Sequence, residues 1–184
     1  TLADLVAGMR ASSAPMNVGT YSSGYRLAIE WFAGMAGVKV SNVPYKGASP
    51  MFTDVVGGRL DWAVTDLVGA AELIRGGKMK PLAVSGTARH PDFPQVPTFG
   101  ESGFPEYVMY TWSSLQVRAD TPEPIVQRLD EALRKVFAQP AVKDFVARAK
   151  VEPMQLAPAD MRRFQQDETA RWKKVADAAG IKPE

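Results

Sequence analysis

The sequence predicts an α/β fold in which a parallel-type β-sheet is flanked by helices. Short β-prone segments alternate with helical segments between residues 1 and 85, and glycines stand where the helices would end. Within the helical segments, apolar residues recur every three or four positions. The 184 residues are 46% hydrophobic and 23% charged, which suits one globular domain or one domain plus part of another.

The first half of the chain alternates strands and helices. It opens with an amphipathic helix whose apolar face carries Leu2, Leu5, Val6 and Met9. Strands are then predicted at Met16–Thr20, Val38–Val43, Trp62–Thr65 and Leu82–Ser85. Helices are predicted over Tyr25–Ala36, from Ser49-Pro50 to Val56, and from Asp66 to Ile74. Repeated strand–helix–strand units of this kind favour parallel pairing in one sheet.

The second half has a different pattern. Arg89–Pro105 is rich in proline and glycine and predicts an ordered loop with a short helix near Phe99–Ser102, followed by a β-rich run at Val108–Val117. Helices are predicted from Thr121-Pro122, from Pro140 to Ala149 and from Pro158 to Ala179, with a strand at Val151–Leu156. So few strands cannot form a stable sheet alone, and we expect this section to need partners elsewhere.

Composition and motifs exclude several functional classes. A net charge of +2 with scattered Lys and Arg argues against a nucleic-acid partner. Cysteine is absent, and no group of His, Asp or Glu has metal-ligand spacing, so we expect neither a metal nor a cofactor. His90 is the only histidine, and Ser22 and Ser23 lack the G-x-S-x-G context of a nucleophile elbow. The sequence therefore predicts no catalytic residue and no enzyme.

Candidate ligand-binding residues follow the predicted strands. In a parallel α/β sheet, ligands bind beyond the carboxyl ends of the strands. The loops at those ends contain Thr20, Tyr21, Ser22, Ser23 and Gly24 after the first strand, Tyr45, Lys46 and Gly47 after the second, and Asp66 after the third. These residues supply hydroxyls, backbone amides and one cation, which is a lining suited to hydrogen bonding.

Ser22-Ser23-Gly24 leads directly into a helix, whose N-terminus presents unpaired N–H groups and the positive end of its dipole. Small residues there allow an anion to approach. Serine is also a common helix cap without any ligand, so plain capping is the alternative reading. Asp66 has the same two readings, a ligand contact or a helix cap, and Lys46 attracts an anion or is merely solvated.

Six motifs follow one another along the chain: Val43-Pro44-Tyr45-Lys46-Gly47, Thr53–Asp61 (TDVVGGRLD), Lys80–Val84 (KPLAV), Val96–Gly103 (VPTFGESG), Ala170–Val175 (ARWKKV) and Ala179–Pro183 (AGIKP). Together they resemble the Bug family, the extracytoplasmic solute receptors of tripartite tricarboxylate transporters. The chain departs from the family pattern at Arg26, which stands where many members have histidine. The loop before it also looks about two residues shorter than in those members.

The resemblance implies a periplasmic-binding-protein-like fold in which two α/β lobes close on a carboxylate. It implies that residues 1–112 are a nearly complete lobe two, that residues 113–184 return into lobe one, and that the signal peptide and the first half of lobe one are absent. It also implies a periplasmic location and the membrane subunits of the transporter as partners. A ligand sensor for a membrane signalling partner is the first alternative. An α/β hydrolase or transferase using Ser22 or Asp66 is the second, less favoured one.

Overall fold

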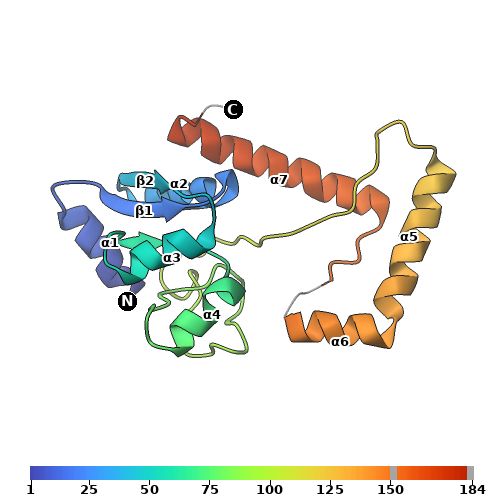
Figure 1. Ribbon diagram of the computed structural model, residues 1–184. Helices are drawn as coiled ribbons and strands as arrows, with labels where there is room; N and C mark the ends of the chain where they lie inside the picture. The colour runs from blue at the N-terminus through green and yellow to red at the C-terminus, as the bar shows by residue number, and fades with distance from the viewer. Residues whose placement is uncertain (150–152, 182–184) are drawn as a thin grey trace. The chain divides into compact units, whose positions relative to one another are not determined.

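The chain forms two compact units, one of Thr1–Thr111 with Lys174–Glu184 and the other of Trp112–Lys173. The computed structural model describes residues 1–149 and 153–181 (Figure 1). The first unit contains the sheet, and the described part of the second contains helices and no strand. The predicted strand at Val151–Leu156 lies partly outside the described residues, and its described part, residues 153–156, forms no strand.

A three-stranded parallel sheet is the framework of the first unit. Its central strand is β1 (Met16–Thr20), which pairs with β2 (Val40–Pro44) on one side and β3 (Trp62–Ala63) on the other. The register runs from Met16 opposite Val40 to Thr20 opposite Pro44. The predicted α/β class with a parallel sheet is therefore confirmed.

Four helices accompany these strands: α1 (Leu2–Ala11), α2 (Ser23–Ala36), α3 (Ala48–Val56) and α4 (Leu67–Arg75). Gly37 ends α2 in the left-handed conformation, with φ of 68°, which glycine adopts without steric cost. The helix predicted to start at Ser49-Pro50 begins one residue earlier, at Ala48, so its N-cap is Gly47 and not Ser49. Pro50 still lies in the first turn, where a missing N–H is tolerated.

Both faces of β1 are covered by helices. A Cβ atom on Gly19 would lie 2.5 Å from Cγ of Met51 in α3, so the backbone of β1 directly contacts this helix. Side chains alternate along a strand, which turns Val18 to the opposite face together with its partner Trp62. There the ring of Phe32 from α2 meets Trp62 edge-on at 5.7 Å. Val18, Phe32 and Met51 are fully buried.

Phe32 is also the centre of an aromatic cluster that joins α2 to the segment after the sheet. Its ring packs edge-on against Phe99, Phe104 and Tyr107 at centroid distances of 5.3, 5.1 and 5.8 Å. The hydroxyl of Tyr107 donates to the carbonyl of Ala28 in α2 at 3.0 Å. This cluster fixes residues 99–107 on the core although they contain no helix or strand.

Two predicted strands did not form. In Leu82–Ser85, Val84 makes only an isolated parallel bridge to Thr98, and Val108–Val117 contains no strand. One backbone pair, Met109 with Ser85, ties the second run to the first at 3.1 Å. The predicted short helix at Phe99–Ser102 is a series of turns.

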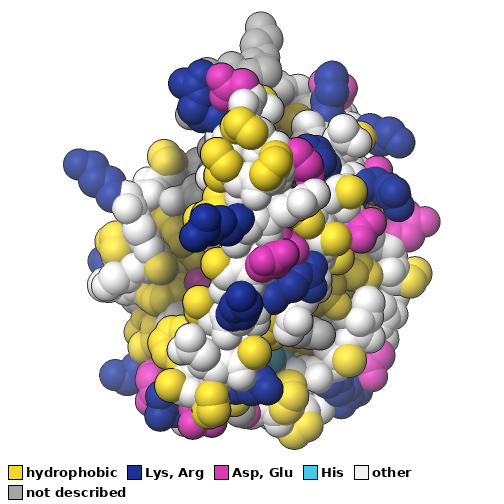
Figure 2. Space-filling view, turned by 90° about the vertical axis from the view of Figure 1, so that its right-hand side faces the viewer, with side chains coloured by type: hydrophobic (Ala, Val, Ile, Leu, Met, Phe, Trp, Pro, Cys, Tyr) yellow, Lys and Arg dark blue, Asp and Glu magenta, His cyan; other side chains and the backbone are white. Residues whose placement is uncertain are grey.

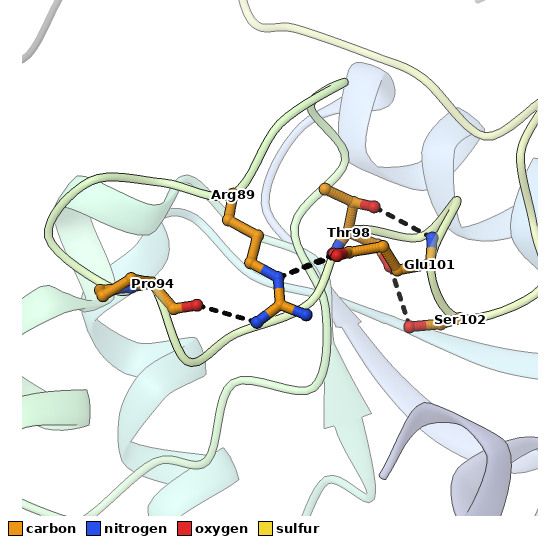
Figure 3. A network of polar contacts seen from close by, with 5 residues as sticks. All are labelled: Arg89, Pro94, Thr98, Glu101 and Ser102. Atoms are coloured by element: carbon orange, nitrogen blue, oxygen red, sulfur yellow. Dashed lines mark hydrogen bonds and ion pairs between the residues drawn. The ribbon is translucent and has the colours of Figure 1, made fainter.

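A polar network holds the loop that contains these turns (Figure 3). Thr98 and Glu101 bind each other reciprocally, since each backbone N–H donates to the other's side chain, at 2.8 and 3.0 Å. Arg89 donates to the Glu101 carboxylate at 2.9 Å and to the carbonyl of Pro94 at 3.0 Å. Ser102 adds a hydroxyl bond to the Thr98 carbonyl at 2.9 Å.

The remaining helices are α5 (Glu123–Ala138), α6 (Pro140–Ala149) and α7 (Pro158–Ala179), and none of their described residues is buried. Figure 2 shows hydrophobic side chains exposed among Lys, Arg, Asp and Glu on the side where α5 lies. Ile125, Leu129 and Val136 of α5, which recur at helical spacing, are among the exposed residues. A hollow of about 310 Å³ between α5 and the start of α7 contains none of the candidate binding residues.

Candidate ligand-binding rim

The predicted binding residues lie at the carboxyl-end edge of the sheet, here called the rim (residues 20–25, 44–48 and 65–66). The parallel register brings the ends of β1 and β2 side by side. The N–H of Tyr45 continues this pairing by donating to the carbonyl of Thr20 at 2.7 Å. Thr20 is buried and so belongs to the base of the rim.

Ser22, Ser23 and Gly24 form the exposed N-terminus of α2. Ser22 is the N-cap, and its Oγ accepts a hydrogen bond from the N–H of Tyr25 at 3.4 Å. Ser22 therefore caps α2, as the capping alternative predicted. Ser23 and Gly24 are exposed, and the first N–H groups of a helix have no partner within it, at the positive end of the helix dipole.

Tyr21 connects the loop after β1 to the loop after β3. Its hydroxyl donates to Oδ2 of Asp66 at 3.0 Å and lies 2.9 Å from Oγ1 of Thr65. Asp66 in turn caps α4, because its Oδ1 accepts from the N–H of Gly69 at 2.6 Å. Both oxygens of Asp66 thus have protein partners, and the capping reading holds for this residue too.

Tyr25 extends this group and was not among the predicted residues. Its ring lies 4.5 Å from that of Tyr21, measured between centroids. Burial raises the pKa of the Tyr25 hydroxyl, and hydrogen bonding to Tyr21 and the negative charge of Asp66 raise it further. Tyr25 is therefore a neutral hydroxyl at any physiological pH. Tyr21 precedes the N-cap of α2 and Tyr25 lies in its first turn, so helical spacing does not pair the two residues in the sequence.

Tyr45 is directed toward α3 instead of toward solvent. Its hydroxyl donates to Oδ2 of Asp54 at 2.7 Å, and the guanidinium of Arg59 binds Oδ1 of the same carboxylate. The Arg59 guanidinium, followed by the Tyr45 hydroxyl, lowers the pKa of Asp54 below its ordinary value. Lys46 is exposed beside this group, and Gly47 caps α3 without a side-chain hydrogen bond.

The rim therefore offers hydroxyls and helix N-terminal N–H groups, which are donors suited to binding an anion. Within residues 1–149 and 153–181 no group of three or more His, Asp or Glu side chains could hold a metal ion. None of the helices in this described part is both long and apolar enough to cross a membrane.

Comparison with known proteins identifies relatives of this chain. Residues 1–181 match the family described as tripartite tricarboxylate transporter family receptor. A Pseudomonas sp. (strain P51) protein in the tcbD-tcbE intergenic region is 31% identical over 150 residues, covering 81% of this chain and 45% of the relative. BugT of Bordetella pertussis is 30% identical, covering 85% of this chain and 48% of its own length.

Solved structures of similar proteins share the fold of this chain. An R. palustris protein with adipate superposes with a TM-score of 0.85 at 32% identity, covering 100% of this chain and 62% of that chain. MatC from Rhodopseudomonas palustris with bound malate gives 0.80 at 27%, covering 95% and 61%. The chain thus spans about half the length of the curated relatives above. It belongs to the tripartite tricarboxylate transporter family receptors, the family that includes the Bug proteins.

Proposed function

We propose that this chain is part of a periplasmic receptor that captures a small carboxylate for the membrane subunits of a tripartite tricarboxylate transporter. The ligand class comprises organic acids, aromatic acids and acidic amino acids, and the protein performs no chemistry on them. The observation that carries the proposal is the exposed N-terminus of α2, where Ser22, Ser23 and Gly24 present hydroxyls and N–H groups at one edge of the sheet. Family membership and the adipate and malate of the similar structures support it.

A thermal-shift screen of the purified protein tests the ligand class. Mono- and dicarboxylates, aromatic acids and acidic amino acids are added separately, and a ligand that binds the folded state raises the melting temperature. At least one acid should give a concentration-dependent rise. The absence of any rise across the panel would contradict the proposal.

Charge at the rim gives a sharper test. Ser22→Asp keeps a good N-cap for α2 but places a carboxylate where the ligand's carboxylate is proposed to lie. Repulsion should weaken binding at least about tenfold while the free protein keeps its melting temperature. The double change of Ser22 and Ser23 to Val should abolish binding. The matched control changes Ser12 and Ser13 to Val, since these serines precede β1 at the opposite edge of the sheet, and it should leave affinity unchanged.

We also propose that residues 1–112 are lobe two of the receptor and that residues 113–184 enter lobe one. The exposed apolar side chains Ile125, Leu129 and Val136 of α5 support a further partner surface, and the curated relatives are about twice as long as this chain. In a receptor of the relatives' length, Leu129→Asp should lower the melting temperature because it would place an unpaired charge in a buried interface. An unchanged melting temperature would show that α5 remains in solvent.

A further inference from the structure

The loop between β2 and α3 has little of its own to hold it in place. α3 begins after Gly47, whose extended backbone makes no side-chain capping bond, and Lys46 is exposed. The loop nevertheless lies beside the end of β1, where the N–H of Tyr45 donates to the carbonyl of Thr20. Tyr45 is the residue in this loop with bonds in two directions, through its backbone to β1 and through its side chain to α3.

The side-chain bond reaches along α3 to Asp54, nine residues further on in the sequence. Asp54 is itself fixed twice. Its carboxylate binds the Arg59 guanidinium, and its backbone carbonyl accepts from the N–H of Arg59 at 2.9 Å. The ring of Tyr45 packs against the buried cluster that includes Met51 and Leu60. Hydrogen bonds to a charged partner are among the stronger ones in proteins.

We infer that Tyr45 is a positioning residue of the rim: clamped by Asp54 and Arg59, it holds the loop 44–48, and through Thr20 the end of β1, in the ligand-binding geometry. The ligand-binding part of this inference rests on the proposed function, whereas the clamp itself does not. The tyrosine hydroxyl, already bound to Asp54, serves as a brace, and the ligand is left to the backbone N–H groups and to Ser22 and Ser23. The Val-Pro-Tyr-Lys-Gly and Thr-Asp-Val-Val-Gly-Gly-Arg motifs are thereby joined in one structural unit.

Amide hydrogen exchange on the purified protein tests the clamp without any ligand. In Tyr45→Phe and in Asp54→Ala, the N–H of Tyr45, which binds the Thr20 carbonyl, should exchange about tenfold faster than in the native protein. Because both changes break the same contact, the double variant should exchange little faster than either single one. The matched control is Tyr107→Phe, which removes a buried hydroxyl bond to Ala28 in α2 and no bond of this loop, and it should leave exchange at Tyr45 unchanged.

Ligand affinity then shows whether Tyr45 positions the binding loop or only stabilises the fold. With adipate and malate as probes, well below the melting temperature, Tyr45→Phe should raise the dissociation constant of whichever acid binds by about tenfold. Tyr107→Phe should lower the melting temperature at unchanged affinity. Faster exchange with unchanged affinity would overturn the positioning role, and unchanged exchange would overturn the clamp itself. If the native protein binds no acid in the wider panel, the proposed function fails while the exchange measurement still decides on the clamp.

Discussion

The Tyr21 hydroxyl donates to Oδ2 of Asp66 at 3.0 Å, while the other oxygen of the same carboxylate caps α4 through Gly69. One side chain thus supports both a helix and a link between two rim loops. We expect Asp66→Ala to lower the free energy of unfolding by about 1–2 kcal/mol, because it removes a helix cap and a tyrosine partner together. Urea denaturation measures the loss.

Asp66→Asn is the control for this prediction. Asparagine caps helices about as well as aspartate, and its amide NH2, in the place of Oδ2, can donate to the Tyr21 hydroxyl. It should therefore cost clearly less than the alanine change, and equal losses for the two variants would rule out capping as the source of the effect.

Gly19 marks a place where β1 has no room for a side chain. An added methyl group would lie 2.5 Å from Cγ of Met51 and 2.6 Å from Cδ1 of Leu60, and both neighbours are buried. Gly19→Ala should reduce the free energy of unfolding by about 1–3 kcal/mol through overpacking. Thermal unfolding, followed by circular dichroism, measures it.

Gly34 in α2 provides the matched glycine, since a methyl group there meets nothing within 4 Å. Gly34→Ala should stabilise the protein by up to about 1 kcal/mol, because alanine favours the helix interior. A loss of stability at Gly34 as large as that at Gly19 would show that packing against Met51 and Leu60 is not the cause.

The Arg89–Glu101 pair makes stability depend on acid pH. The Arg89 guanidinium, and after it the N–H of Thr98, lowers the pKa of Glu101 to about 2 from an ordinary value of 4.5. The folded state therefore prefers the ionised carboxylate. Its stabilising contribution is fully present above pH 4.5 and is lost as the pH falls toward 2. Glu101→Gln should lower the melting temperature at neutral pH and should leave it near that of the native protein at pH 2.

The measurement is a series of melting curves between pH 2 and pH 7 for the native protein and Glu101→Gln. The difference between the two curves should shrink steadily below pH 4.5. A constant difference across the series would mean that Glu101 acts through packing and not through its charge.

The buried hydroxyl of Tyr107 supports α2 from a segment with no regular structure. Tyr107→Phe removes the buried hydroxyl bond to the carbonyl of Ala28, at 3.0 Å, and should cost about 1–2 kcal/mol of unfolding free energy. Tyr110→Phe is the comparison, because that side chain is 57% exposed and water can replace its bond to the N–H of Thr87. Equal costs would contradict the role given to burial.

The sequence was most informative where local chemistry decides the structure. β1, α2 and α4 begin and end within a few residues of the predicted positions. Gly37 ends α2 and Asp66 caps the start of α4, and both residues can be recognised in the sequence. Val108–Val117 is β-prone in composition yet forms no strand, and its neighbour Val84 pairs only with Thr98. Strand formation there depends on tertiary pairing, which β-propensity does not encode.

At the rim, too, local features could be predicted from the sequence and tertiary contacts could not. The placement of Ser22 and Asp66 at helix N-termini could be predicted because capping is a local preference. The direction of the tyrosines could not, since Tyr45 meets Asp54 only once α3 has packed beside β2. Tyr25 was missed for a similar reason: its position on α2 reads as an ordinary helical residue until Tyr21 and Asp66 are seen next to it.

The close approach at Gly19 also has an evolutionary consequence. The Cβ position of residue 19 is already filled by Met51 and Leu60, so the three positions share one volume. Across related chains, a larger residue at position 19 should be accompanied by a smaller one at position 51 or 60. An alignment of relatives can measure this covariation, and frequent alanine at position 19 beside unchanged Met and Leu would show that the backbone moves apart instead.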